Sequence, residues 1–340
     1  MVKKRSTIMN VTNIIEDTTL TVGASGANFT TIQAALDFLN DKWINPTAIV
    51  TIQIADGTYT LTSPIIQTHP CGSQIKILGT NTYSKSMTSV QSSSGGSGAW
   101  SIIINIAVNV NLIAVNDYVI ISGAAGGSNP TYILGCHKVT NVDVANSRIT
   151  VASKHINASA PSGNVTATVL VIKTMLAFTG CDGFQFSYAN TLNYLGKMVL
   201  IGDGTGGGHN GIWAVFTGSI NCGSTSLGLD AWNVGISAGY HAAIRATGIV
   251  ISGCSYGARS EVGAAVTPNT GTITGCTNGI YCYRAGSVFA ANAIITGNAT
   301  GIFAGTYGFV HAGSATFSGN TTDTNPAVNT QGNEYGYIDT

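Results

Sequence analysis

The last third of the chain has a 22-residue period, and this period limits the folds that the chain can adopt. Four segments of one pattern follow each other at that step without insertions: ISGC (251–254), ITGC (273–276), ITGN (295–298) and FSGN (317–320). Other columns with the same step are Ile244, Val266, Val288 and Val310, and Ile236, Ala258, Ile280 and Ile302. A short fixed period with apolar positions in register predicts stacked units that bury a shared core.

The residue types in each repeat favour strands. Gly, Thr, Ser, Asn and β-branched residues alternate with period two, and the apolar spacing of a helix is absent. Three apolar columns separated by Gly or Asn turns predict three short strands per coil, the unit of a parallel β-helix whose coils lie about 4.8 Å apart. One column places Cys254, Cys276, Asn298 and Asn320 just after a glycine, where an interior ladder of thiol and amide groups can form.

The chain carries few charges. Charged residues are 8% of the 340 residues, against about 25% in ordinary soluble proteins. No run of about 20 apolar residues exists that could span a membrane, because the longest apolar stretch, 102–119, is broken by asparagines and an aspartate. The net charge of zero gives no electrostatic footprint for nucleic acid or for an anionic membrane. We therefore expect no nucleic-acid partner and no membrane insertion.

No sequence feature indicates export or metal binding. Residues 3–5 are basic, but 6–17 lack the apolar segment of a signal peptide, so we expect no export by that route. The seven cysteines include no pair with metal-type spacing, and we expect buried free thiols. His241 and His311 have no second histidine or acid at ligand spacing, so we expect no metal and no cofactor.

The N-terminal part divides into two segments. Residues 1–20 lack strong periodicity and are expected to form an arm or attachment segment, and 21–99 the cap and first coils of the β-helix. Within 21–40, Thr30 or Thr31 can cap a helix. The apolar face of that helix is Ile32, Ala35, Leu36 and Leu39. Such a helix would cover the open end of the coils, where core and strand edges are otherwise exposed.

Residues 100–172 break the register. Their alternating strands, joined by Gly and Asn turns, predict a small barrel-like β-module inserted between early and late coils, with 92–98 (SSSGGSG) as a flexible linker leading into it. The alternative is that 100–172 are irregular coils with long loops. We expect the main β-helix over 173–340.

The run VGASGANFTTIQAALDFLN (22–40), followed by IQIADGTYTL (52–61), resembles the start of the pectin-lyase-like right-handed β-helices, above all those of bacteriophage tailspikes and tail fibres. Pectin methylesterases begin similarly. The resemblance covers residues 21–80 by sequence and 231–340 by architecture. It implies an all-β fold: a right-handed parallel β-helix of about 22 residues per coil, with an N-terminal capping helix and an inserted small β-module.

The resemblance also implies a function. It implies a virion structural protein, a homotrimeric tail spike or fibre that mediates attachment of the phage to its host through surface polysaccharide. Its partner on the virion would be a tail or baseplate protein, held by the N-terminal arm. The protein would be assembled in the host cytoplasm without a signal peptide and located in the virion tail. A polysaccharide depolymerase on the same β-helix, hydrolase or lyase, is the alternative, and an architectural spacer is a third reading.

No catalytic residue can be assigned from the sequence. The acids and arginines of the pectin methylesterases and lyases find no counterpart, and GHN (208–210) near Asp203 is more easily a turn than a catalytic motif. Glycoside hydrolysis needs two carboxylates about 5 to 9.5 Å apart. Asp230 and Glu261 fall in different columns, so they are not stacked neighbours. The sequence therefore favours binding over cleavage.

One outer face gathers candidate glycan contacts. If position 258 points inward, then 259 and 261 point outward and form two exposed columns. The candidates are Arg259, Glu261, Tyr281, Tyr283 and Arg284. Aromatic rings beside Arg and Glu can stack on sugars and bond their hydroxyls, although packing against a neighbouring subunit, or plain surface, would also explain them. Outward apolar residues such as Phe289 and Phe303 favour an oligomer.

Overall fold

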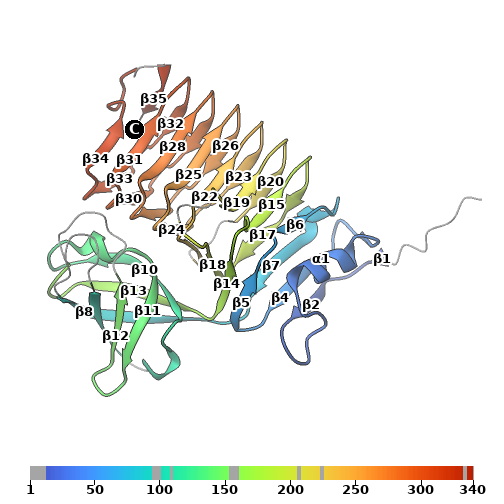
Figure 1. Cartoon of the computed structure of the whole chain (residues 1–340), viewed down its shortest axis with the longest axis horizontal. Helices are drawn as coiled ribbons and strands as arrows, with labels where there is room; N and C mark the ends of the chain where they lie inside the picture. The colour runs from blue at the N-terminus through green and yellow to red at the C-terminus, as the bar shows by residue number, and fades with distance from the viewer. Residues whose placement is uncertain are drawn as a thin grey trace, which may run out of the picture.

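The computed structural model describes residues 13–93, 101–107, 110–152, 161–204, 208–222, 226–331 and 335–339. They form a parallel β-solenoid of about 11 turns, with a closed antiparallel β-barrel packed beside it (Figure 1). The predicted fold class, with its capping helix and its inserted module, is confirmed. The average turn has roughly 24 residues. The 22-residue step holds in the later coils, where Ile251, Ile273 and Ile295 are paired neighbours.

Three long parallel sheets form the sides of the solenoid. Sheet I contains β5 (Gly57–Leu61), β14 (Thr174–Phe178), β18 (Met198–Ile201), β21 (Leu227–Asp230), β24 (Val250–Ser252), β27 (Thr272–Thr274), β30 (Ile294–Thr296) and β33 (Thr316–Ser318). Sheet II contains β6 (Ile65–Gln67), β15 (Phe184–Phe186), β19 (Asn210–Ala214), β22 (Val234–Ala238), β25 (Tyr256–Glu261), β28 (Asn278–Tyr283), β31 (Thr300–Ala304) and β34 (Thr322–Asn325). Sheet III contains β16 (Thr191–Leu192), β20 (Ser219–Asn221), β23 (Ala243–Arg245), β26 (Ala265–Thr267), β29 (Ser287–Phe289), β32 (Phe309–His311) and β35 (Tyr337–Asp339).

The first coils add two smaller sheets. Sheet IV contains β2 (Thr18–Val22), β4 (Val50–Ile54), β7 (Ile75–Gly79) and β17 (Tyr194–Gly196), while β1 (Asn13–Ile14) pairs with β3 (Trp43–Ile44). The 3-10 turn η1 (Gly72–Gln74) precedes β7. Residues 13–20 of the expected arm therefore already contribute strands, because Thr18 is paired with Val50. Residues 1–12 lie outside the described residues.

The interior of the solenoid is built from the apolar columns. Val266, Val288 and Val310 are in register on neighbouring strands of sheet III and fully buried. In sheet II, Ile280 and Ile302 are likewise paired on neighbouring strands and fully buried. Alternation along each strand sends every second side chain inward, so stacking coils produces the continuous core that no single coil could make.

The predicted polar column forms a ladder at one turn of the coil. The Asn298 side chain accepts from the Cys276 N–H at 2.9 Å and donates to the Ile273 carbonyl at 3.1 Å. Asn320 repeats this one coil later, accepting from the Asn298 N–H at 2.9 Å and donating to the Ile295 carbonyl at 2.9 Å. Each amide therefore satisfies the turn of the preceding coil. All seven cysteines are present as thiols, and burial raises the pKa of Cys222 to about 12.

The predicted helix caps the N-terminal end. Helix α1 (Ile32–Leu39) begins after Thr31, whose hydroxyl accepts from the Ala34 N–H at 3.1 Å, and it buries its predicted apolar face. Its Gln33 side chain bonds both backbone groups of Ile66 on β6, accepting from the N–H at 2.9 Å and donating to the carbonyl at 3.2 Å. A side-chain amide thus satisfies part of a strand edge that would otherwise be open.

The inserted module is a closed six-stranded barrel. Its strands are β8 (Thr82–Ser93), β9 (Ser101–Ile106), β10 (Tyr118–Ala125), β11 (Gly135–Asp143), β12 (Arg148–Ala152) and β13 (Thr166–Ile172), in the order β10-β11-β12-β9-β8-β13. The 3-10 turns η2 (Val110–Leu112) and η3 (Pro130–Ile133) lie in its loops. The barrel starts at Thr82, not at residue 100, because β8 pairs with both β9 and β13. Ser92 and Ser93 of the expected linker belong to β8, and 94–98 lie outside the described residues.

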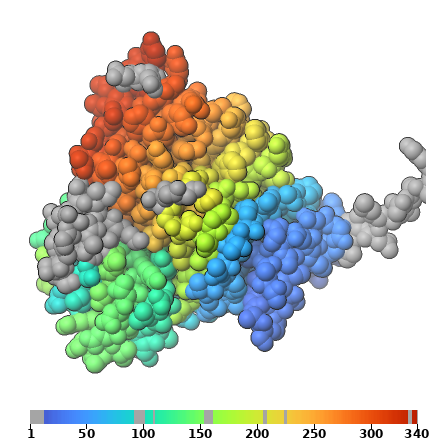
Figure 2. Space-filling model, in the orientation of Figure 1, coloured from blue at the N-terminus to red at the C-terminus, as the bar shows by residue number. Residues whose placement is uncertain are grey.

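The barrel packs on the outer face of sheet I and forms a lobe of its own beside the coils, drawn in green in Figure 2. The Tyr118 hydroxyl donates to Asp230 Oδ2 at 3.2 Å, and the Cys136 N–H donates to Ser252 Oγ at 2.8 Å. Around these bonds lies an apolar cluster that joins the two units: Tyr118, Ile120, Cys136, Ile172, Met175, Val199 and Val250. The barrel therefore covers the outer face of sheet I along this contact, and no other partner can bind there. It does not make this contact with sheets II and III.

Close approach of barrel and solenoid depends on Gly135. A β-carbon there would lie 2.6 Å from Thr274 Cγ2 and 2.9 Å from Ser252 Oγ, and its φ is +134°. We expect Gly135→Ala to lower the free energy of unfolding by about 1–2 kcal/mol more than Gly57→Ala does. Gly57 has a similar positive φ, +141°, but an added β-carbon would lie no closer than 4.0 Å to its nearest neighbour, so it reports backbone strain alone. Thermal unfolding of both variants measures the difference, and equal losses would contradict close packing at Gly135.

Candidate functional site

One outward column runs along the whole of sheet II. Strand pairing places its members in register on eight strands: Ile66, Gln185, Trp213, Ser237, Arg259, Tyr281, Phe303 and Asn325. Aromatic, amide, hydroxyl and guanidinium groups therefore follow each other along the solenoid axis. Successive positions lie about 4.8 Å apart. This column is the basis of the candidate site.

The five residues predicted from the sequence lie together on β25 and β28 and the turn after them. Arg259 Nη2 donates to Glu261 Oε1 at 2.9 Å, and the Tyr283 hydroxyl donates to Glu261 Oε2. The Arg284 guanidinium lies over the Tyr283 ring, 5.1 Å from its centroid. Burial, and then the bond to Glu261, raise the pKa of Tyr283 above its usual value. We call Arg259, Glu261, Tyr281, Tyr283 and Arg284 the charged cluster.

Aromatic neighbours enclose the ring of Tyr281. It stacks on Phe303 with centroids 4.9 Å apart and an interplanar angle of 9°. Tyr256 and Tyr283 meet it in edge-to-face contacts at 4.9 and 5.1 Å. The charged cluster therefore offers polar groups and ring edges to a ligand, not the open ring face on which sugars stack. Sequence columns predict which residues meet, but they do not give this arrangement of the rings.

A second aromatic group lies at the corner after sheet II, and the repeat pattern did not predict it. Tyr188, Phe216 and Tyr240 stack in successive coils, with centroids 5.3 and 5.0 Å apart. They are 75%, 45% and 49% exposed. We call them the aromatic corner. Its only signal in the sequence is an aromatic residue two positions beyond the end of β15, β19 and β22, and the coils there lack the 22-residue step that would have aligned them.

A pocket of about 180 Å³ lies between this corner and the outward column. It is lined by Gln185, Phe186, Ser187, Tyr188, Trp213, Val215 and Phe216. Gln185 and Trp213 come from the column, and Tyr188 and Phe216 from the corner. The pocket joins the two surfaces.

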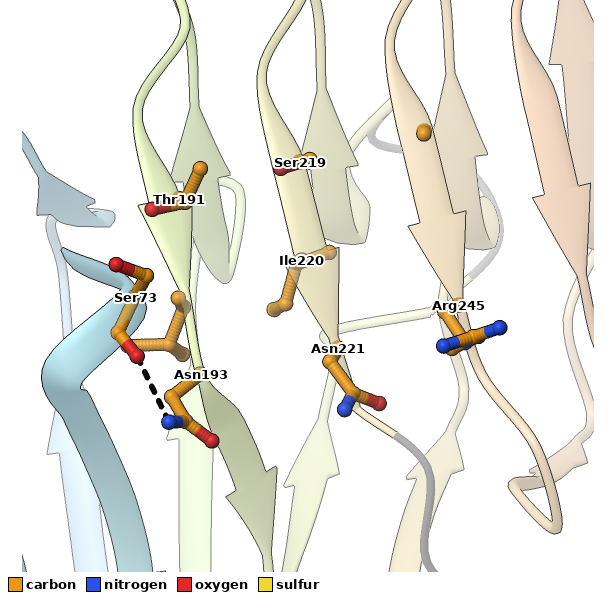
Figure 3. Close-up of a pocket in the computed structure, with 9 residues that line it drawn as sticks. Ser73, Thr191, Asn193, Ser219, Ile220, Asn221 and Arg245 are labelled. Atoms are coloured by element: carbon orange, nitrogen blue, oxygen red, sulfur yellow. Dashed lines mark hydrogen bonds between the residues drawn. The ribbon is translucent and has the colours of Figure 1, made fainter.

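Sheet III carries a different, more polar depression (Figure 3). It holds about 340 Å³ and is lined by Ser73, Thr191, Leu192, Asn193, Ser219, Ile220, Asn221, Ala243 and Arg245. In Figure 3, Asn193, Asn221 and Arg245 project from adjacent strands, and the Asn193 amide donates to the Ser73 carbonyl at 2.7 Å. Its lining offers hydrogen-bonding groups beside small apolar side chains, but no aromatic ring on which a sugar could stack.

The two acids compared in the sequence, Asp230 and Glu261, do not form a catalytic pair. Asp230 lies under the barrel on sheet I, whereas Glu261 belongs to the charged cluster on sheet II. Asp203 accepts from the Gly180 N–H at 2.7 Å, and Asp182 from the Asn210 N–H at 2.6 Å. Among the residues that the structure describes, no group of three or more His, Cys, Asp or Glu could hold a metal ion, and no helix is long and apolar enough to cross a membrane.

Comparisons with known proteins give structural matches only. Neither a family model nor a curated protein matches the sequence. The chain is similar to the Gp54 tailspike of Acinetobacter baumannii bacteriophage AP22, solved in complex with A. baumannii capsular saccharide (TM-score 0.29, 9% identity, 79% of this chain and 53% of that chain). It is also similar to the tailspike protein gp49 from Pseudomonas phage LKA1 (TM-score 0.32, 15% identity, 84% of this chain and 56% of that chain). The chain thus spans about half the length of these proteins.

Proposed function

We propose that this chain is a component of a phage tail spike or tail fibre that binds host surface polysaccharide along the outer face of sheet II. The observation that carries the proposal is the outward column, whose aromatic and polar side chains recur from coil to coil. From Trp213 to Phe303 the column covers four coil steps, about 19 Å at the usual strand spacing. A linear polymer lying along the axis can contact the partly exposed members of this stretch, Trp213, Arg259, Tyr281 and Phe303, whereas Ser237 between them is buried.

The remaining parts of the proposal follow from the resemblance at residues 22–61. The chain assembles as a homotrimer in the virion tail, and the N-terminal arm ahead of β1 attaches it to a tail or baseplate protein. Outward apolar side chains on sheet III support an oligomer, since Phe289 is 40% exposed and its ring centroid lies 6.5 Å from that of Phe309. Host attachment is then the role of the exposed sheet faces.

Polysaccharide cleavage on the same face is the second candidate. The charged cluster holds a half-buried carboxylate, Glu261, between two donors. Hydrolysis by the usual route needs a second carboxyl group about 5 to 9.5 Å away. A neighbouring subunit, or an irregular coil of the same chain, would supply it.

Arg284→Ala is expected to weaken binding of the host polysaccharide about tenfold, because a hydrogen bond from a charged donor contributes about 1.5–3 kcal/mol. The chain offers a matched control in Arg245, an arginine on sheet III. Titration of both variants against purified polysaccharide compares the two faces. If Arg245→Ala loses polysaccharide binding and Arg284→Ala keeps it, the binding site lies on sheet III and not on sheet II.

The same polysaccharide tests the second candidate. Chain length, reducing ends and ultraviolet absorbance of unsaturated products are followed for the wild type and Glu261→Gln. Binding without shortening agrees with an adhesive spike. Shortening by the wild type, lost in Glu261→Gln, would instead make the protein a depolymerase with its site in the charged cluster, and the absorbance would separate a lyase from a hydrolase.

A further inference from the structure

The aromatic corner is not required by the turn on which it lies. At this turn two consecutive residues have positive φ, such as Tyr188 (+52°) with Ala189 (+63°) and Phe216 (+48°) with Thr217 (+65°). Asn, Asp and Gly are the residues that favour such a backbone. In later coils the first position is Val262, with φ +53°, and then Arg284 and Thr306. Aromatic residues therefore occur there in three coils for a reason other than the fold.

Their exposure points to recognition of a ligand. Tyr188 stays 75% exposed, so its ring loses little water on folding and adds little stability. Contiguous exposed aromatic groups mark binding surfaces instead. Tyr188 is the first ring of the stack and the most exposed of the three, and it also lines the pocket. The pocket thus has an open ring, in contrast to the enclosed Tyr281.

Gln185 supplies an oriented hydrogen-bond acceptor in the same pocket. Its Nε2 donates to Asp182 Oδ2 at 2.9 Å. A carboxylate can only accept, so the amide orientation is fixed and Oε1 is the end left for a ligand. Asp182 is itself held by the N–H and the side-chain amide of Asn210, at 2.6 and 3.1 Å. Hydrogen bonds within the protein therefore fix the orientation of Gln185 Oε1 before any ligand binds.

The lining also determines the charge of a suitable ligand. None of the seven lining side chains is charged at neutral pH: four are aromatic, and the others are a glutamine, a serine and a valine. An anionic group buried beside them would lack a partner. Rings with an amide acceptor and a hydroxyl instead suit a molecule with one apolar face and a rim of hydroxyl groups.

We propose that this pocket holds one neutral pyranose ring of the bound polysaccharide, stacked on Trp213 and Tyr188 and donating a hydroxyl hydrogen bond to Gln185 Oε1. The inference rests on the proposed function and makes it more specific. The polymer is seated at the aromatic corner, and the charged cluster, further along the axis, contacts only its continuation. Acidic sugars are excluded from the pocket position.

The test compares Trp213→Ala and Tyr188→Ala with Tyr307→Ala. Tyr307 is a matched control because it is also exposed, has a positive φ of +62° and stacks on a tyrosine, Tyr335, at 5.2 Å. Binding is measured with purified host polysaccharide and with methyl glycosides of neutral hexoses and of glucuronic acid, by saturation-transfer NMR. We expect at least tenfold weaker polysaccharide binding in the two pocket variants, little change in Tyr307→Ala, and transfer to neutral glycosides only.

Other results separate the inference from the function on which it rests. If the polysaccharide still binds both pocket variants but not Arg284→Ala, the sugar site in the pocket is refuted, and the proposed function of polysaccharide binding on sheet II is retained. Absence of binding by the wild type would overturn both. Sedimentation of the same variants gives a further check: dissociation of an oligomer by Tyr188→Ala would make the corner a contact between subunits and overturn the sugar site.

Discussion

Val288→Asp is expected to prevent folding of the solenoid. Val288 is fully buried between Val266 and Val310, and strand pairing fixes it in register with both. A carboxylate there loses its water and gains no partner, at an effective cost of several kcal/mol. A folded domain is stable by only about 5–15 kcal/mol. Soluble yield and thermal unfolding followed by circular dichroism measure the effect.

The neighbouring residue provides the control. Phe289 belongs to the same strand, but its side chain points outward and is 40% exposed. Phe289→Asp is expected to change the free energy of unfolding of the isolated chain by less than about 1 kcal/mol. If the Val288→Asp variant were folded and heat-resistant while Phe289→Asp was unfolded, Phe289 would face the core of the solenoid and Val288 the solvent, contrary to the structure.

Asn298→Ala is expected to have the second largest effect, a loss of about 2–4 kcal/mol, because each buried polar group that loses its bond costs about 1–3 kcal/mol. The substitution leaves the Cys276 N–H and the Ile273 carbonyl without their side-chain partner inside the solenoid. Thermal or denaturant unfolding measures the loss, provided that the transition is reversible.

The column itself supplies the comparison for this prediction. Cys254 and Cys276 occupy the equivalent position in the two preceding coils, where their thiols donate to the Ser252 and Thr274 carbonyls at 3.5 and 3.4 Å. Asn298→Cys therefore extends an arrangement that the protein already uses, and we expect it to cost less than half as much as Asn298→Ala. Equal losses would mean that the amide hydrogen bonds of Asn298, which neither alanine nor cysteine can make, account for the whole effect and that a thiol does not replace them.

The fold could be predicted where the repeat is regular. From Gly228 to Asn325, partners such as Val250 and Thr272 follow the 22-residue step, so simple alignment predicted the strands and the inward columns. The insertion was recognised because its strands lack that step. Its start was placed too late, since β8 alternates in the same way as a coil strand and only its pairing with β13 shows that it belongs to the barrel.

The site was predictable only in part. The charged cluster was found because its residues lie in regular coils. Trp213 shares the outward column, but its partners Gln185 and Ser237 stand at other, unequal steps along the chain, so the period does not align them. The orientation of the rings depends on side-chain packing between coils. Neighbouring rings enclose the ring of Tyr281, whereas the ring of Tyr188 is exposed to solvent. The alignment of one sequence column does not predict this difference.

The position of the barrel in the sequence has a consequence for how the protein is made. Ile77 of β7 pairs with Leu195 of β17, and Thr58 of β5 with Met175 of β14, so the two coils in contact are separated by the whole barrel sequence. The barrel closes through antiparallel neighbours within residues 82–172 and can form as soon as it leaves the ribosome. The capped first coil must wait with one edge unpaired until the ribosome has passed the barrel. The first coil can therefore join the later coils only after the whole barrel sequence has been made.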